Sequence, residues 1–169
     1  MIREATIQDL EEIMTNVRAV VKWMHERGSR QWDMSYPTEA DYQKDIDRRE
    51  LFVYLLEGKI VGVYTISREG HQEYPSINWT SVVPAWTLKR VAINPDYHGR
   101  GIADQLMRFA EEQAKSAGIY RINTDTYSEN LHAQKLFKRH GYQLVDKRTG
   151  RRGTIEFFYF EKVLSKEED

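Results

Sequence analysis

The sequence predicts a mixed α/β (α+β) fold, and three observations support this prediction. Short runs with strand-like composition alternate along the chain with segments whose apolar residues recur every three or four positions. Glycines stand directly after the helical segments, where helices commonly end. No internal repeat, low-complexity tract or linker divides the 169 residues. We therefore expect a single domain over residues 1–169, built as layers of helices on a sheet.

The first half of the chain predicts a strand, two helices and a hairpin. Thr6 with Asp9, and Thr38 with Asp41, have the spacing of capping boxes, in which side chains satisfy free backbone groups at a helix start. Gly28 is the expected stop of the first helix. The expected strands cover residues 1–5, 51–56 and 60–67, and the expected helices cover residues 10–27 and 39–49.

The second half predicts a long irregular connection and then alternating strands and helices. The connection, residues 70–84, has the length of loops that tend to be functional or mobile. Ser128 is the expected cap of the last helix. The expected strands cover residues 86–93, 120–126, 142–146 and 154–163, the helices residues 102–117 and 129–139, the final turn residues 149–153 and a frayed charged tail residues 165–169.

Composition excludes several classes of function. The formal net charge of −1 gives no indication of a nucleic acid or an anionic membrane as partner. The absence of cysteine excludes a disulfide framework, a thiolate metal site and a cysteine nucleophile. The five histidines lack metal-ligand spacing, so we expect no metal. The acidic N-terminus does not resemble a signal peptide and the longest apolar run is six residues, so we expect a cytoplasmic protein.

The stretch from Leu88 to Ala117 organises the rest of the chain. A strand-like run ends at Asn94-Pro95-Asp96, a glycine-containing turn follows, and a helical pattern begins at Ile102. The first N–H groups of a helix lack internal partners and attract anions, and glycines let a backbone approach a phosphate closely. The turn lacks the Gly-Lys-Ser/Thr of a P-loop and the third glycine of a dinucleotide-binding fingerprint. A tight loop that binds no ligand remains an alternative at this point.

The turn resembles the R/Q-x-x-G-x-G/A pyrophosphate loop of the GNAT (Gcn5-related) N-acetyltransferases. Gly101 and Ala103 match its small positions, and His98 stands where the family prefers Arg or Gln. The opening IREATIQDL and the order of elements also match the family. The resemblance implies a mostly antiparallel, twisted sheet of about six to seven strands, splayed in the middle and flanked by four to five helices. It also implies acetyl-CoA as co-substrate, held by His98, Gly99, Arg100, Gly101, Ile102 and Ala103.

A second segment, from Asn130 to Tyr142, resembles the family's N-x-x-A-x-x-L-Y/F-x-x-x-G-F/Y pattern. Asn130, Ala133 and Phe137 share one face of a helix. The resemblance places them along the pantetheine arm, although a capped amphipathic helix with buried residues explains the same pattern. It further implies that a backbone N–H within Val91, Ala92 and Ile93 points at the thioester oxygen, as in an oxyanion hole.

The expected reaction is direct attack of an amine on the acetyl thioester in a ternary complex. The family's usual general acid is a tyrosine at the position of Phe137, and phenylalanine cannot donate a proton. Three interpretations remain open: Tyr127 or Ser128 substitutes, water protonates the thiolate, or the protein binds acetyl-CoA without efficient turnover. Placement alone suggests Glu73, His71 or Asp125 as the general base, and a solvated surface role is the favoured interpretation of each.

The acceptor, a small-molecule or peptide amine, is expected to meet the segments 31–37 and 71–86. Trp32, Tyr36 and Tyr74 could form an aromatic pocket, or they and Trp79 could pack the loops onto the core. Family habit suggests a homodimer through the last strands. Two other functions are alternatives: an acyl-CoA-binding sensor, which Phe137 favours, and an NAD- or nucleotide-binding enzyme, whose third glycine and ribose-binding acid are missing from the sequence.

Overall fold

The computed structural model describes residues 1–150 and 153–166 and has the mixed α/β fold that the sequence predicts. Seven strands form one sheet in the order β1-β2-β3-β4-β5-β7-β6. The pairs β1–β2, β2–β3, β5–β7 and β7–β6 are antiparallel, and β4 and β5 run parallel. The strands are β1 (Ile2–Glu4), β2 (Leu51–Leu56), β3 (Lys59–Ser67), β4 (Trp86–Ile93), β5 (Arg121–Tyr127), β6 (Gln143–Gly150) and β7 (Gly153–Val163).

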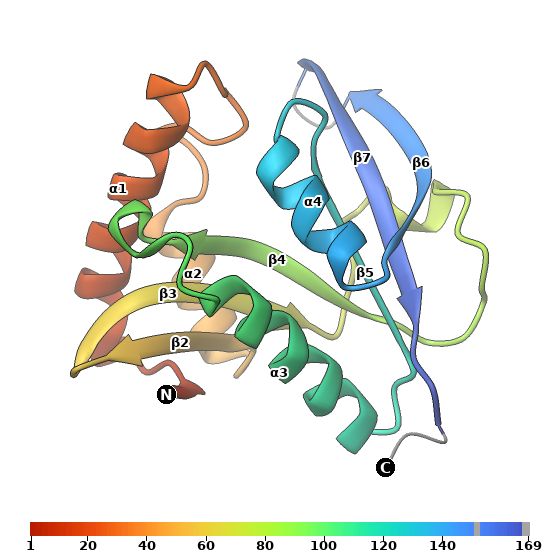
Figure 1. The fold of residues 1–169 in the computed structure, drawn as a ribbon, viewed down its shortest axis with the longest axis horizontal. Coiled ribbons are helices and arrows are strands. Elements are labelled where there is room, and N and C mark those ends of the chain that lie inside the picture. The colour runs from red at the N-terminus through yellow and green to blue at the C-terminus, as the bar shows by residue number, and fades with distance from the viewer. Residues whose placement is uncertain (151–152, 167–169) are drawn as a thin grey trace. The chain divides into compact units, whose positions relative to one another are not determined.

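Four α-helices connect these strands in the part of the chain that the structure describes (Figure 1). They are α1 (Leu10–Glu26), α2 (Glu39–Asp47), α3 (Ile102–Ser116) and α4 (Leu131–Arg139). The expected turn at residues 149–153 and the expected tail at 165–169 lie partly outside the described residues. The predicted fold class is confirmed, whereas the splay of the sheet stays a prediction.

The chain packs into two compact units, each made of two segments of sequence. The first unit is Met1–Ile66 with Lys89–Leu106, and the second is Ser67–Leu88 with Met107–Asp169. Strand β4 and helix α3 therefore begin in one unit and end in the other. A single domain over residues 1–169 stays a prediction.

Helix α1 supplies much of the core of the first unit. Its buried side chains recur at the spacing of one helix face, and they pack with residues of β2, β3 and the second half of β4, among them Val53, Val63 and Ala92. The helix ends where predicted, because Gly28 has a φ of 77° and closes the last turn. Both Thr6 and Thr38 donate their backbone N–H to the aspartate three residues later, as capping boxes require.

The second unit is built on the β5–β7–β6 ladder. Tyr74, Ile77, Phe157 and Tyr159 form a buried cluster that joins the connection after β3 to strand β7. The parallel ladder joins Trp86 to Ile122 and Thr87 to Asn123. No helix in residues 1–150 and 153–166 has the length and hydropathy needed to cross a bilayer.

One predicted helix start was wrong. Ser128 does not cap α4; Asn130 does, since its side-chain oxygen accepts the N–H of Ala133 at 3.1 Å. The N–H of Ser128 instead donates to the carbonyl of Glu156 at 2.9 Å, which extends the β5–β7 pairing. The cap therefore lies two residues later than predicted, at Asn130. The last two strands are also longer than predicted, because β6 continues to Gly150 and β7 begins at Gly153.

Candidate functional site

The turn between β4 and α3 lies entirely within the first unit. After Ile93, the side chain of Asn94 accepts the N–H of Asp96 at 3.0 Å, and Pro95–Tyr97 form a short 3-10 turn. Gly99 and Gly101 then adopt φ values of 78° and 76°. These values lie in the region that side chains disfavour, so the two glycines are needed for this path of the backbone. A Cβ at either glycine would meet no heavy atom within 4 Å, so the surface of the turn is open.

A run of backbone donors without intramolecular acceptors among the described residues lies at this turn. Within the described residues, the N–H groups from Gly99 to Ala103 donate to no acceptor. Helix α3 begins in this run, so its dipole adds positive potential at the same place. The guanidinium of Arg100 lies 4.9 Å from the ring centre of Tyr97, and the ammonium of Lys59 lies 5.7 Å from it. Free amides, a helix start and two cations together suit a phosphate-bearing ligand.

The side chain of His98 turns toward the protein. Its Nε2 lies 3.1 Å from the carbonyl oxygen of Ile93, and its ring meets that of Trp23 edge-on at 4.9 Å. A contact with a carbonyl requires the proton on Nε2. A ligand in this turn would therefore be held mainly by main chain, as the substitution of His for Arg or Gln suggests.

Strand β4 is continuous from Trp86 to Ile93, but its backbone has an irregularity at Arg90, which is called the break below. Arg90 has a φ of 51° although it is not glycine. Beyond it, Ala92 is buried, and its carbonyl accepts the side-chain amide of Asn16 at 3.0 Å. Val91 and Ile93, the other residues expected beside the thioester, are half-buried. The break was missed from the sequence, because no local pattern predicts a positive φ at an arginine inside a strand.

The predicted aromatic residues of the first unit are occupied by structural contacts. Trp32 is buried in the core with α1, and its carbonyl lies 2.9 Å from Nε2 of His25. The hydroxyl of Tyr36 accepts a hydrogen bond from Arg90 at 3.1 Å. Packing of the loop onto the core, the alternative given above, therefore describes Trp32.

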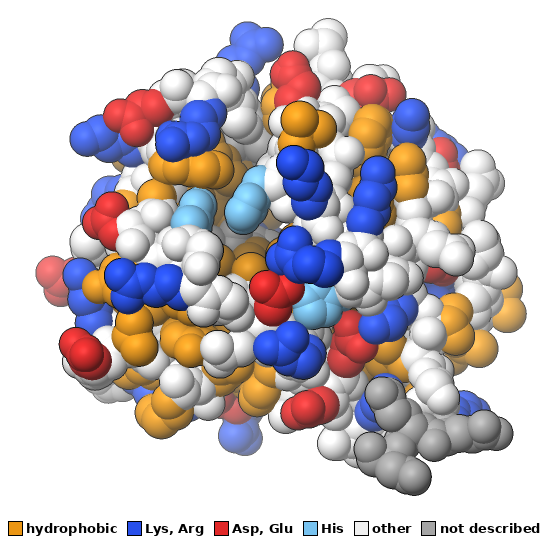
Figure 2. All heavy atoms as spheres, in the orientation of Figure 1, with side chains coloured by type: hydrophobic (Ala, Val, Ile, Leu, Met, Phe, Trp, Pro, Cys, Tyr) orange, Lys and Arg blue, Asp and Glu red, His pale blue; other side chains and the backbone are white. Residues whose placement is uncertain are grey.

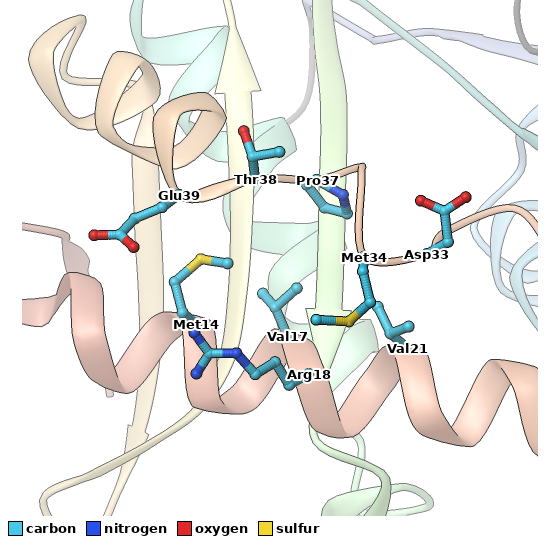
Figure 3. A pocket seen from close by; sticks show the side chains of 9 residues that line it. All are labelled: Met14, Val17, Arg18, Val21, Asp33, Met34, Pro37, Thr38 and Glu39. Carbon is cyan, nitrogen blue, oxygen red and sulfur yellow. The ribbon is translucent and has the colours of Figure 1, made fainter.

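A pocket of about 170 Å³ lies beside these residues, between α1 and the segment before α2 (Figure 3). Its wall is mostly apolar. The charged side chains are Arg18 from α1, Asp33 from the segment before α2 and Glu39 from the start of α2. The lining residues are Met14, Val17, Arg18, Val21, Asp33, Met34, Pro37, Thr38 and Glu39. Asp33 already accepts the N–H of Ser35 at 2.7 Å, so part of its charge stabilises the segment itself.

In the second unit, the three candidate bases lie around one aromatic cluster. The hydroxyl of Tyr74 donates to Asp125 at 2.6 Å, and the hydroxyl of Tyr159 donates to Glu73 at 2.8 Å. The ring of His71 lies 5.5 Å from that of Tyr74. Trp79 belongs to the same cluster and donates its indole N–H to the carbonyl of Tyr74 at 2.8 Å. Both carboxylates therefore hold tyrosines in place, and Trp79 packs as the alternative above describes.

The second family-like segment forms the start of α4. The oxygen of the Asn130 side chain caps the helix, while its NH₂ group donates to no acceptor among the residues described. Ala133 is half-buried on the following turn. The ring of Phe137 is only 5% exposed and packs on Phe160 at 5.2 Å between centroids.

The two candidate acids differ in the contacts that they make. Tyr127 is buried, and its hydroxyl donates to Glu129 at 2.9 Å. Ser128 is half-buried, with its backbone paired to β7. The catalytic roles assigned to both from the sequence stay predictions.

The described residues show neither a patch of one charge on the face drawn in Figure 2 nor a cluster of metal-binding side chains. Figure 2 shows basic and acidic side chains interspersed over one face of the molecule. No group of three or more His, Asp or Glu side chains within residues 1–150 and 153–166 is arranged to hold a metal ion.

Comparison with known proteins gives a family. A model described as the acetyltransferase (GNAT) family matches residues 17–142. A Bacillus subtilis (strain 168) protein named for [ribosomal protein bS18]-alanine N-acetyltransferase is 29% identical over 89 residues, which are 53% of this chain and 58% of that protein. An aminoalkylphosphonate N-acetyltransferase from Salmonella typhimurium (strain LT2) is 26% identical over 89 residues, 53% of each chain. The match thus spans little more than half the length of these curated relatives.

Solved structures share the fold over nearly the whole chain. The crystal structure of a GNAT-family acetyltransferase from Streptococcus agalactiae 2603 superposes with a TM-score of 0.87. The alignment covers 98% of this chain and 95% of the other, at 22% identity. At that identity the likeness establishes the fold alone.

Proposed function

Because this chain belongs to the acetyltransferase (GNAT) family, we propose that it transfers the acetyl group of acetyl-CoA to a primary amine of a small molecule or a peptide. The observation that carries the proposal is the turn before α3. Two glycines with positive φ and a run of five residues with free N–H groups form a cradle for the diphosphate of coenzyme A. The cations of Arg100 and Lys59 stand beside it.

The two curated relatives support an amine as acceptor. One is named for an alanine of a ribosomal protein and the other for an aminoalkylphosphonate. The acceptors in these names are thus a protein in one case and a small molecule in the other. This chain is expected to use an amine of one of these two classes. The exchange needs no metal, and a cytoplasmic location, where acetyl-CoA is available, is part of the proposal.

The reaction follows from the chemistry of the thioester. The neutral amine nitrogen attacks the carbonyl carbon, a C–N bond forms, and the C–S bond breaks to release the thiolate of coenzyme A. The amine loses a proton to a base, and the thiolate gains one. A backbone N–H of Val91, Ala92 or Ile93 would stabilise the negative charge that develops on the carbonyl oxygen. With no cysteine in the chain, the acetyl group passes directly to the amine.

The source of the proton for the thiolate is the open step. A thiol with a pKa near 8.5 leaves without strong help, so water or the hydroxyl of Tyr127 or Ser128 would suffice. General acid–base help is often worth only about 10²–10⁴-fold. The assignment of Asn130, Ala133 and Phe137 to the pantetheine arm is part of the proposal and rests on the family pattern.

A second candidate function is an acyl-CoA-binding sensor with little turnover. The specific observation in its favour is Phe137, which lacks the hydroxyl of the family and is buried. Incubation with acetyl-CoA and a panel of amines, with free thiol measured over time, separates the two functions. Tight binding of CoA without thiol release from any amine would favour the sensor.

The turn itself is tested by Gly101→Glu, which places bulk and negative charge at the cradle. We expect the affinity for CoA, measured by titration calorimetry, to fall roughly tenfold or more, since a lost charge-assisted contact is worth about 1.5–3 kcal/mol. Gly118→Glu is the matched control. Gly118 has a φ of 78° and the same open surroundings, but it lies after α3. Both variants should lose similar stability; equal CoA affinity in both would refute the site.

A further inference from the structure

Arg90 differs from the other residues with unusual backbone angles. Among the described non-glycine residues, positive φ values occur at Arg49, Glu57 and Arg90. Arg49 and Glu57 lie in turns next to β2, whereas Arg90 lies inside β4. A left-handed conformation costs a non-glycine residue roughly 1–2 kcal/mol and persists only where surrounding contacts impose it. An interruption of this kind changes the direction of the N–H groups that follow it in a strand.

The side chain of Arg90 is held by a buried carboxylate. Its guanidinium donates from two nitrogens to the two oxygens of Asp45, at 2.8 and 2.7 Å. The side chains are 12% and 4% exposed respectively. A third nitrogen donates to the hydroxyl of Tyr36 at 3.1 Å, and Asp45 also accepts the hydroxyl of Thr65 at 2.7 Å. A two-point contact of this type fixes orientation as well as distance.

The backbone of Arg90 is held as well. The hydroxyl of Tyr42, a fully buried residue of α2, donates to the carbonyl of Arg90 at 3.3 Å. Asp45 also belongs to α2, so one helix holds both ends of the strained residue. The contacts reach Arg90 from residues 45 and 48 positions earlier in the sequence.

The two donors of these contacts, Arg90 and Tyr42, keep their protons at alkaline pH. Burial opposes the charge of Arg90, but the hydrogen bonds that Arg90 donates to Asp45 and Tyr36 and its attraction to these two groups together outweigh burial and raise the pKa of Arg90 above its usual value. Burial also raises the pKa of Tyr42 well above its usual value, so its hydroxyl stays protonated and keeps donating.

A buried ion pair is a poor device for stability alone. Well-packed apolar residues of similar volume are often as stabilising or more so. Here the pair also maintains a strained backbone, one residue before the amides assigned to the thioester. Strain that is maintained in this way is commonly found at functional sites.

We propose that Arg90 and Asp45 are positioning residues, which hold the break in β4 so that an N–H between Val91 and Ile93 points at the thioester oxygen. The inference rests on the proposed function and adds what orients the strand. It predicts a preference for acetyl-CoA over CoA, since only acetyl-CoA carries the carbonyl oxygen. The preference depends on Arg90, while the grip on the diphosphate does not.

The experiment measures dissociation constants for CoA and acetyl-CoA by calorimetry, together with the melting temperature. For the native chain, acetyl-CoA should bind several-fold tighter. In Arg90→Ala and Asp45→Asn the ratio of the two constants should fall to about one, with CoA affinity within about twofold of the native value. Arg90→Gly removes the side chain but tolerates the positive φ, so it should retain more of the preference than Arg90→Ala.

Arg49→Ala and Arg49→Gly form the matched control. Arg49 has a φ of 59° and an exposed ion pair with Glu4, outside the strand, so both variants should keep the native ratio. Tyr42→Phe removes one hydroxyl and leaves the ion pair. It keeps the inference testable if Arg90→Ala and Asp45→Asn fail to fold. It should lower the ratio partly.

The outcomes separate the inference from the proposed function. Absence of CoA binding by the native chain would refute the function. Binding of CoA and acetyl-CoA with equal affinity would refute the role of the strand. A native preference that survives in Arg90→Ala, Asp45→Asn and Tyr42→Phe, with only the melting temperature lowered, would show that the ion pair merely stabilises the fold.

Discussion

At the scale of single residues, Phe137 shows how a family position can change its role. Its ring is buried on Phe160, and the ring of Tyr142 lies 6.1 Å away. Because aromatic rings pack against this side chain, we expect a hydroxyl added to it to meet mainly apolar surroundings. We therefore interpret the phenylalanine at this position, where the family has tyrosine, as a packing residue of the second unit.

The substitution Phe137→Tyr tests that interpretation. We expect a loss of about 1–3 kcal/mol of stability, the usual cost of a buried polar group without a partner, and no gain in thiol release from acetyl-CoA. Chemical denaturation and a thiol assay on the same sample measure both. Faster release with unchanged stability would mean that the ring edge reaches the reacting atoms.

Residue-level prediction from the sequence succeeded where the cause is local. The glycines expected to end helices or shape the turn, Gly28, Gly99, Gly101 and Gly118, all have positive φ. Arg90 could not be predicted in this way. Its conformation depends on Asp45 and Tyr42, which the fold brings to it from another helix.

At the scale of elements, the long connection after β3 is more ordered than its length suggests. Glu161 of β7 accepts the N–H and the hydroxyl of Thr80, and it pairs with Arg121 of β5 at 3.0 Å. Arg121 also donates to the carbonyl of Val83 at 2.9 Å. A further contact joins the N–H of Asn78 to Asp146 at 3.0 Å. The connection is therefore tied to three strands of the second unit.

Removal of the buried partner should loosen this connection. Arg121→Met leaves Glu161, 2% exposed, without its counter-charge, so we expect a loss of about 3–5 kcal/mol in the free energy of unfolding. Arg148→Met is the control, since the Arg148 side chain is 39% exposed in its pair with Asp146 and should contribute less than about 1 kcal/mol. Equal losses in the free energy of unfolding of both variants, measured by urea denaturation, would contradict the role given to the buried Arg121–Glu161 pair.

The elements themselves were predictable to different degrees. Helices α1 and α3 follow a long apolar period, and both end close to the predicted glycine. The lengths of the last two strands were not predictable, because their pairing with each other sets them, whereas the start of α4 follows the local cap that Asn130 provides.

At the scale of the whole molecule, the candidate ligand turn belongs to one short stretch of chain. Lys89–Leu106 joins the first unit from the middle of the sequence, and it carries Arg90, the strand amides and the glycine turn. The net charge of −1 gives no long-range attraction for an anion. Attraction must therefore be local, from free amides, the start of α3, Arg100 and Lys59.

The most direct measurement follows the backbone amide signals of this stretch by NMR during a titration with CoA. We predict that the amides of Gly99, Gly101, Ile102 and Ala103 shift with the amount of CoA bound and reach saturation. Pantetheine, which lacks the diphosphate, should leave these amides unmoved. Saturation of amides elsewhere in the chain, with those of Gly99 to Ala103 unchanged, would contradict the account.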